Sequence, residues 1–202
     1  MQRKQFLLAS LSAAVLGISA CSKSDGPSAS STPSSGGSGD QPRRTVSLEI
    51  VANEAKGFSA GSMMSAMVAY VFFDPQCPHC GHLWNASLPL QKKVRFVWIP
   101  VGLINPTSSA QGATLLSAAD PAQAMSEHET SLLANQGGIG TSSSVTEEAR
   151  QAVAANTALF NNLGLEGVPF TIVKNARTGQ PVTRGGSMET PMLAELIGID
   201  AP

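Results

Sequence analysis

The strongest constraint on the fold is an uninterrupted apolar run, Met67–Phe73 (MVAYVFF), which is followed closely by two cysteines, Cys77 and Cys80. A continuous apolar run of this length is typical of a central strand whose two faces are both covered. We expect a helix to begin at the Cys77 turn and to run toward Leu88, where Pro89 would stop or kink it. The sequence therefore predicts two thiols at the junction between a buried strand and a helix.

The segment Cys77-Pro78-His79-Cys80 has the composition of a redox site. Cys77 would lie where free backbone N–H groups and the positive end of the helix dipole stabilise a thiolate, and His79 would favour the same charge. Pro78 stiffens the turn and lacks an N–H donor. Cys80 follows one turn later, so we expect it to be more buried and to act as the resolving thiol that attacks a mixed disulfide. A C-x-x-C in this position is the thioredoxin-like redox arrangement.

Other roles for the cysteine pair are weaker. A structural disulfide would close a loop of only four residues, worth about 2 kcal/mol on the chain-entropy estimate. A haem attachment site needs His directly after the second cysteine, where Gly81 stands. A metal site could use Cys77, Cys80 and His82, but the chain has no second cysteine pair. We expect no cofactor beyond a redox-active Cys77–Cys80 disulfide, and metal binding stays open as an alternative.

A second motif, Gly167-Val168-Pro169-Phe170, precedes another apolar strand. In thioredoxin-like folds a cis-proline at the start of a strand packs opposite the active-site cysteines. The backbone of the residue before it, here Val168, then offers a short strand edge to a substrate chain. The alternative is a trans proline that opens an edge strand. Beside the C-P-H-C segment we expect Val168 and Pro169 to form the cis-proline loop.

Residues 1–20 have the pattern of a bacterial secretory signal peptide, because Arg3 and Lys4 precede a short apolar stretch. The stretch ends in Ile-Ser-Ala before Cys21, which resembles a lipobox and implies that Cys21 becomes a lipidated N-terminus. The alternative is an ordinary signal peptide that leaves Cys21 as a free thiol. Ser22 follows, with no acidic residue in that place. By analogy with Gram-negative sorting we expect a periplasmic protein that is lipid-anchored to the outer membrane.

The next segment, residues 22–44, contains no aromatic and no branched aliphatic side chain. We therefore expect residues 21–44 to form a lipidated cysteine with a disordered Ser/Gly/Pro linker, and residues 45–202 to form one folded domain. The formal net charge of −1 provides no basic field to hold nucleic acid. No apolar run approaches the roughly 20 residues that a bilayer-spanning helix needs.

Along the folded domain, hydrophobic periodicity, caps and turn residues predict alternating strands and helices. The expected strands are 45–52, 67–73, 94–101, 170–174 and 180–183, the last two forming a hairpin. The expected helices are 77–88, 108–119, one capped by Asp120, one opened by a capping box at Ser144 and Glu147 and closed by Gly164, and one from Thr190 to Gly198. This order indicates an α/β layer architecture.

The runs FFDPQCPHCGHLW and VRFVWIPVGLINPTSSAQGATLLSAADPAQAMSEHE resemble the catalytic domain of the DsbC/DsbG family of periplasmic thiol–disulfide isomerases, and DsbG more closely. The resemblance covers roughly Val68 to Ile197. It implies a thioredoxin-like fold with an inserted helical segment at about 102–163. It also implies that Cys77 is the nucleophile and Cys80 the resolving cysteine.

The same resemblance implies isomerisation or reduction of disulfides and oxidised cysteines in exported proteins, with a DsbD-like membrane partner as electron donor. Residues 45–67 are too short for the family's N-terminal dimerisation domain, so we expect a monomer. Val168 stands where the family usually has Thr, and both Val168 and the Pro78-His79 pair resemble the oxidase DsbA, which would imply a DsbB-like partner. A thioredoxin-like metal-binding or assembly factor is the alternative of another class.

Other polar residues carry weaker signals. Asp74 fits the family pattern before the cysteines or simply shapes the turn. His82 is expected at a solvated helix position. His128 lies between Glu127 and Glu129 on what we expect to be a surface helix, and we assign it no role.

Overall fold

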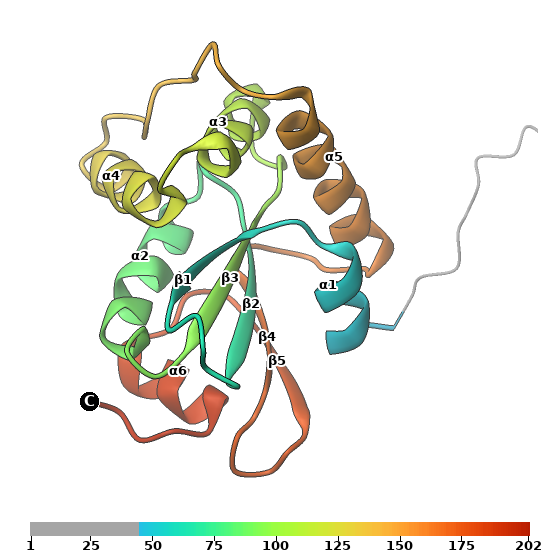
Figure 1. Ribbon diagram of the computed structural model, residues 1–202, viewed down its shortest axis with the longest axis vertical. Helices are drawn as coiled ribbons and strands as arrows, with labels where there is room; N and C mark the ends of the chain where they lie inside the picture. Colours follow the sequence, from blue (N-terminus) through green and yellow to red (C-terminus); the bar gives the residue numbers. More distant parts are fainter. Residues whose placement is uncertain (1–44) are drawn as a thin grey trace, which may run out of the picture. The chain divides into compact units, whose positions relative to one another are not determined.

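The computed structural model describes residues 45–202. The predicted signal peptide, the lipidation site Cys21 and the predicted linker lie outside the described residues. The described chain forms a five-stranded sheet in the order β1-β3-β2-β4-β5, with helices on both faces (Figure 1). Among residues 45–202 no helix is long and apolar enough to cross a membrane.

The predicted apolar strand lies at the centre of the sheet. It is β2, Val68–Phe73, and it pairs in parallel with β3, Arg95–Pro100, and antiparallel with β4, Phe170–Lys174. The short strand β1, Phe58–Gly61, pairs with the outer edge of β3, and β5, Pro181–Gly185, forms the predicted hairpin with β4. Strand β2 is therefore hydrogen-bonded to a neighbouring strand along both of its edges.

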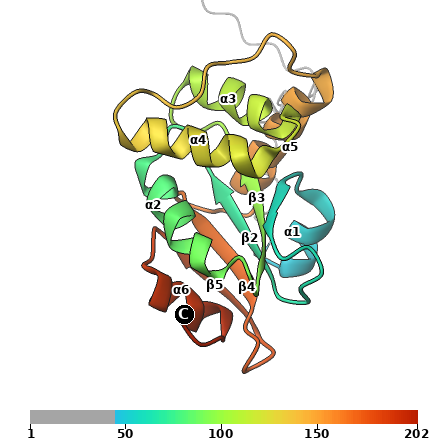
Figure 2. The same cartoon turned by 60° about the vertical axis from the view of Figure 1, so that its left-hand side comes forward.

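Alternate residues of β2 enter two hydrophobic cores, because side chains of a strand point to opposite faces in turn. Val71 and Phe73 pack on the face covered by α2, Pro78–Ser87, and α6, Thr190–Ile197. Phe72 packs on the other face, where α1, Leu48–Glu54, and α5, Glu147–Asn162, lie (Figures 1 and 2). Its ring packs edge-on against that of Phe160, with the ring centroids 5.7 Å apart. A turn of 3-10 helix, Leu88–Leu90, follows α2. The strand that leads into Cys77 is thus fixed from both sides.

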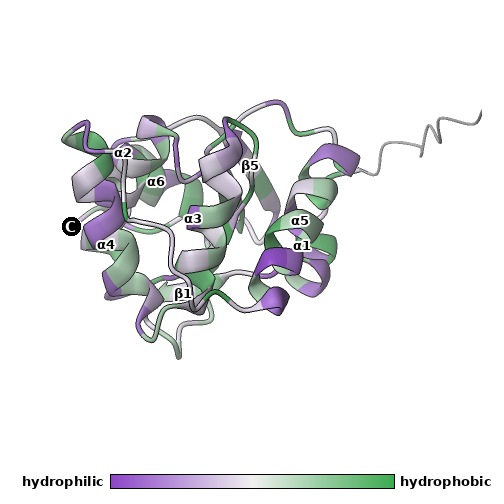
Figure 3. Cartoon of the chain, turned by 90° about the horizontal axis from the view of Figure 1, so that it is seen from above, coloured by the Kyte–Doolittle hydropathy of each residue, from purple (hydrophilic) through white to green (hydrophobic). Residues whose placement is uncertain are grey.

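The helical insertion follows β3. It contains α3, Pro106–Ser117, α4, Pro121–Leu133, and α5, Glu147–Asn162, before the chain returns to β4. Helices α3 and α4 lie beyond the end of the sheet at which β2 runs into α2 (Figures 1 and 2). Viewed from above, α4 and α5 carry both hydrophilic and hydrophobic segments, as expected for helices with one buried face (Figure 3). The insertion therefore covers the end of the sheet that carries the cysteines.

The prediction of a strand over residues 45–52 is wrong. This segment contains α1, Leu48–Glu54, whose Val51 is fully buried in the core on the α5 side. The alternation of apolar residues here is short, and Leu48, Val51 and Ala55 also match the spacing of one helix face. The edge strand β1 was not predicted, because its four residues, FSAG, carry little strand propensity and are held by pairing with β3.

The capping box predicted at Ser144 is also wrong. The N-cap of α5 is Thr146, whose side chain accepts the backbone N–H of Ala149 at 3.2 Å. Ser144 instead pairs its hydroxyl with that of Ser142. The predicted cap of α4 is confirmed, because the Asp120 side chain accepts the N–H of Gln123 and Pro121 is the first helical residue.

Candidate active site

Cys77 is the N-cap residue of α2, and Pro78 is the first residue of the helix. The residue is 6 % exposed, so it is largely covered by its neighbours. Its pKa is lowered from 9.0 to about 6, chiefly because the thiol of Cys80 donates a hydrogen bond to it. Burial opposes this shift, while the backbone N–H groups of Cys80 and His79 and the charge of His79 lower the pKa further. Cys77 is therefore largely a thiolate at neutral pH.

Cys80 has the opposite character. It is fully buried, and burial raises its pKa well above 9.0, with the neighbouring Cys77 adding to the rise. Both cysteines are free thiols in this structure. A nucleophilic thiolate at the helix N-terminus and a protonated thiol one turn further in are the pair that thiol–disulfide exchange requires.

The cis-proline loop lies directly against Cys77. The Val168–Pro169 peptide bond is cis, as expected, and Pro169 leads into β4. The sulfur of Cys77 is 3.7 Å from the carbonyl oxygen of Val168, although the two residues are 91 positions apart in the sequence. The fold therefore brings together the two motifs that sequence analysis predicts to form one site.

Asp74 holds the loop before the cysteines. Its carboxylate is fully buried and accepts three backbone N–H groups: one from Gln76 at 2.8 Å, and those of Leu103 and Ile104 at 2.7 and 2.9 Å. The carbonyl oxygen of Asp74 also accepts the N–H of Cys77 at 3.0 Å. Asp74 thus shapes the turn, and it also ties the turn to the start of the helical insertion.

Gln76 ties the same loop to the insertion through its side chain. Its amide donates to the side-chain oxygen of Gln111 at 2.6 Å and to the carbonyl of Gly137 at 3.0 Å. Gln111 is buried and donates in turn to the carbonyls of Gly137 and Ile139. Sequence analysis missed this network, because glutamines in a polar-rich loop and helix give no local signal of a shared contact.

His128 is not a surface residue, contrary to the sequence-based expectation. It is fully buried, and the N–H of Ile139 donates to its Nδ1 at 3.1 Å, so Nε2 carries the proton and donates to the carbonyl of Pro75 at 2.6 Å. Burial lowers the pKa of His128. The expectation failed because α4 packs across α2, which turns this side of α4 inward.

Glu129 is buried for the same reason. Its side chain is fully covered, and burial raises its pKa to about 9, with the charge of Cys77 as a smaller cause.

His79 and His82 lie on the exposed side of α2, with ring centroids 6.3 Å apart. Within residues 45–202 no three His, Cys, Asp or Glu side chains come together as a metal-binding group.

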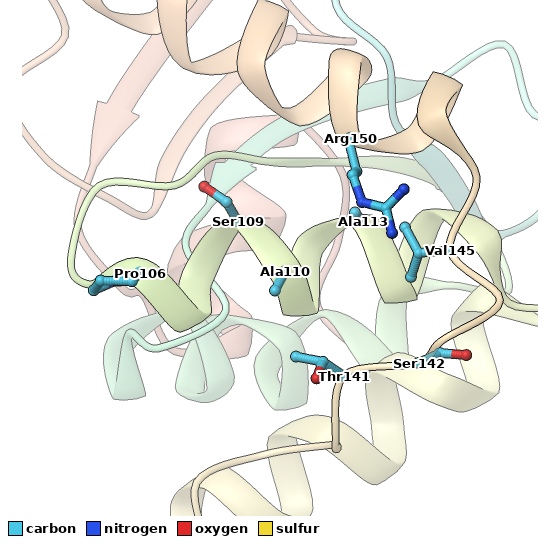
Figure 4. A pocket seen from close by; sticks show the side chains of 8 residues that line it. All are labelled: Pro106, Ser109, Ala110, Ala113, Thr141, Ser142, Val145 and Arg150. Carbon is cyan, nitrogen blue, oxygen red and sulfur yellow. The ribbon is translucent and has the colours of Figure 1, made fainter.

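A separate pocket of about 410 Å³ lies within the insertion (Figure 4). It is lined by Pro106, Ser109, Ala110, Ala113, Thr141, Ser142, Val145 and Arg150. None of these residues belongs to the loop before Cys77 or to the cis-proline loop. We place the candidate site at the thiols, because the residues that line the pocket include no cysteine, histidine or carboxylate, and its Arg150 lies 3.6 Å from the exposed carboxylate of Glu147.

No family model matches the chain. It is 31 % identical to the thiol:disulfide interchange protein DsbG of Pseudomonas aeruginosa over 133 residues, which are 65 % of this chain and 51 % of that protein. It is also 31 % identical to DsbG of Escherichia coli K12 over 114 residues, 54 % of this chain and 44 % of that protein. The chain is therefore similar in sequence to DsbG over part of its length. The chain spans about half the length of the curated relatives it matches.

Solved structures agree on the fold of the described domain. The catalytic domain of Proteus mirabilis ScsC aligns with a TM-score of 0.57 at 18 % identity, over 74 % of this chain and 91 % of that chain. The thiol-disulfide exchange protein α-DsbA2 of Wolbachia pipientis aligns with a TM-score of 0.52 at 18 % identity, over 70 % of this chain and 85 % of that chain. These similarities confirm the predicted thioredoxin-like fold.

Proposed function

We propose that this protein is a thiol–disulfide oxidoreductase of the bacterial cell envelope, which isomerises or reduces disulfides or reduces oxidised cysteines in exported proteins. The observation that carries the proposal is the pairing of Cys77, with its pKa lowered to about 6, and the buried, protonated Cys80. Relatedness to the DsbG interchange proteins supports the same class of reaction.

In the reductive direction, the Cys77 thiolate attacks one sulfur of a substrate disulfide. A Cys77–substrate disulfide forms, and the second substrate sulfur leaves as a thiolate. Cys80 then loses its proton and attacks the sulfur of Cys77, which releases the first substrate sulfur and leaves a Cys77–Cys80 disulfide. The substrate gains two electrons and the cysteine pair loses two. Isomerisation begins with the same first step, after which a different thiolate of the substrate attacks the mixed disulfide, forms a new substrate disulfide and releases Cys77 as a thiolate.

The cis-proline loop gives the substrate a place to bind. The carbonyl of Val168 lies 3.7 Å from the sulfur of Cys77, just before β4 begins. An extended substrate chain that pairs with the backbone at Val168 would carry its cysteine to Cys77. This mode of binding recognises backbone, so it suits an enzyme that acts on many sequences.

The second candidate is a DsbA-like oxidase that donates its disulfide to exported chains. It is favoured by Val168 before the cis-proline and by the Pro78-His79 pair, and a stabilised Cys77 thiolate also makes the disulfide a stronger oxidant. The isomerase or reductase would draw electrons from a DsbD-like membrane partner, whereas the oxidase would be reoxidised by a DsbB-like one. We further propose that the protein is a monomer anchored through lipid on Cys21.

The test is disulfide exchange with insulin in the presence of a thiol reductant, measured for the wild type, Cys77→Ser and Cys80→Ser. Cys77→Ser should abolish exchange, and Cys80→Ser should accumulate mixed disulfides with insulin. His82→Ala, which changes an exposed position on the same helix, is the matched control and should keep wild-type activity. Full activity in Cys77→Ser would rule out the proposed function.

A further inference from the structure

A buried carboxyl group lies beside the cysteine pair and has no part in the reaction described above. Glu129, on α4, is fully covered, and within the described chain neither of its carboxyl oxygens has a hydrogen-bond partner. An unpaired carboxylate in such a place is costly, so the group is held in its neutral form. Its pKa of about 9 agrees with this. At neutral pH, Glu129 is therefore a carboxylic acid that carries a proton.

The carboxyl group of Glu129 lies against the first turn of α2. A side chain built on Gly81, the residue after Cys80, would place its Cβ 2.5 Å from Oε2 of Glu129, so the carboxyl group occupies the space that only glycine leaves open. Met125, one turn earlier on α4, packs in the same core cluster as Cys77 and Cys80. This side of α4 therefore faces the core that contains the cysteine pair.

The thiols are the titratable groups that face this carboxyl group from the elements around it. Helix α4 packs against α2, α3 and β1, and the last two carry no titratable side chain. At α2 the buried groups are Cys77 and Cys80, whereas His79 and His82 are exposed. His128, on α4 itself, is bonded to the loop carbonyl of Pro75 and to the N–H of Ile139. The charge of Cys77 raises the pKa of the carboxyl group, and the carboxyl group raises that of Cys80.

In the exchange reaction the sulfur of Cys80 must take up a proton. When a substrate thiolate attacks Cys77 in the oxidised protein, the sulfur of Cys80 leaves as a buried thiolate. Such a leaving group is poor unless it is protonated as it departs. We propose that Glu129 gives a proton to Cys80 when this sulfur leaves and takes it back when Cys80 attacks. This inference rests on the proposed function of the cysteine pair.

The step balances in both directions. In the forward direction, the substrate thiolate bonds to the sulfur of Cys77, the Cys77–Cys80 bond breaks, and the proton of Glu129 moves to Cys80, leaving Glu129 as a carboxylate. In the reverse direction, the Glu129 carboxylate removes the proton of Cys80, Cys80 bonds to Cys77, and the substrate leaves as a thiolate. No other oxidant or reductant takes part.

The experiment compares oxidised wild-type protein with Glu129→Gln, which keeps the shape and neutrality of the acid but has no proton to transfer. The rate at which glutathione forms a mixed disulfide is measured by acid quenching across a range of pH. General acid catalysis contributes about 10²–10⁴-fold in enzymes, so we expect Glu129→Gln to be at least about tenfold slower at neutral pH. Glu127→Gln, an exposed change two residues earlier, should match the wild type.

The pH profile separates proton transfer from a structural role. The ratio of the wild-type rate to the Glu129→Gln rate should fall toward one as pH rises through the pKa of Glu129, because the acid is then lost. In the oxidised protein this pKa is lower than the value of about 9, since no Cys77 thiolate is present, but burial still raises it. A ratio that stays at one, or that does not change with pH, overturns the inference.

A second measurement does not depend on the rate. A protonated buried carboxyl gives a carbonyl infrared band that ionised carboxylates lack, and this band should be present in the wild type at neutral pH and missing in Glu129→Gln. Its absence from the wild type overturns the inference. If the wild type exchanges no disulfide with glutathione, the proposed function fails. If the wild type is active and Glu129→Gln is equally fast, only the inference fails.

Discussion

At the scale of single residues, the two cysteines differ because of where the helix places them. Cys77 lies at the N-terminus of α2, where the Cys80 thiol and backbone N–H groups stabilise its thiolate. Cys80 lies under the insertion, where burial keeps it protonated. The sequence predicts this difference, because the C-x-x-C spacing alone separates the helix N-terminus from the first buried turn.

The lowered pKa of Cys77 predicts how reactivity depends on pH. Alkylation of the reduced protein by iodoacetamide should occur at Cys77, with a rate that rises through pH of about 6, while Cys80 stays unmodified. Mass spectrometry of peptides after a short pulse of reagent checks this. A rate that rises only near 9.0, the ordinary thiol value, would show that the site does not stabilise the thiolate.

The same shift predicts how stability depends on pH. The pKa of Cys77 is lower in the folded state than in the unfolded state, so its thiolate stabilises the reduced protein fully above pH 9.0. This contribution is lost as pH falls to about 6. Denaturant unfolding of the reduced wild type and of Cys77→Ser should therefore give free energies that converge as pH falls through this window. A constant difference between them would contradict the assignment.

At the scale of elements, most strands and helices follow from hydrophobic patterns and caps. The central strand, Val68–Phe73, was predicted from the continuous apolar run Met67–Phe73, and the start of α4 was predicted from Asp120 and Pro121. The errors lie where a local pattern is ambiguous or where packing decides. The α1 segment satisfies both strand and helix spacing, and the burial of His128 and Glu129 depends on how α4 crosses α2, which no local pattern reports.

The contact between the loop and the insertion predicts a loss of stability in Asp74→Ala. The change leaves three backbone N–H groups without the carboxylate that accepts them, among them those of Leu103 and Ile104. A buried unsatisfied group costs about 1–3 kcal/mol, and because these three N–H groups are only partly buried, the free energy of unfolding should fall by about 2 kcal/mol in total. Asp120→Ala, which removes an exposed helix cap, should cost about 1 kcal/mol and serves as the comparison. Equal losses would mean that Asp74 is only a local turn residue.

At the scale of the whole molecule, the fold joins sites that the sequence keeps far apart. The cis-proline loop contacts the cysteine turn through Val168 and Cys77, which are 91 positions apart in the sequence. The helical insertion packs against both the turn and α2. The cysteines and the cis-proline loop could be predicted because each has its own short motif. The network of Asp74, Gln76 and His128 could not, because its partners share no motif and meet only in the folded chain.

The direction of electron flow is a property of the protein in the cell. An isomerase or reductase is held reduced by its partner, so thiol alkylation after acid quenching should find Cys77 and Cys80 mostly as free thiols. An alkylating reagent that adds mass to each free thiol separates the reduced from the oxidised protein and so measures the fraction of each. A mostly oxidised pair would contradict the isomerase or reductase function and favour the DsbA-like oxidase.

Disulfide exchange through Cys77 is the central claim of this account. The most direct test is to incubate Cys80→Ser with a peptide that contains one disulfide, and to measure the mass of the intact product. We predict a covalent adduct of the peptide at Cys77 that a reductant removes, and no adduct when Cys77 is also changed to Ser. No adduct in the single variant, or the same adduct in the double variant, would contradict the claim.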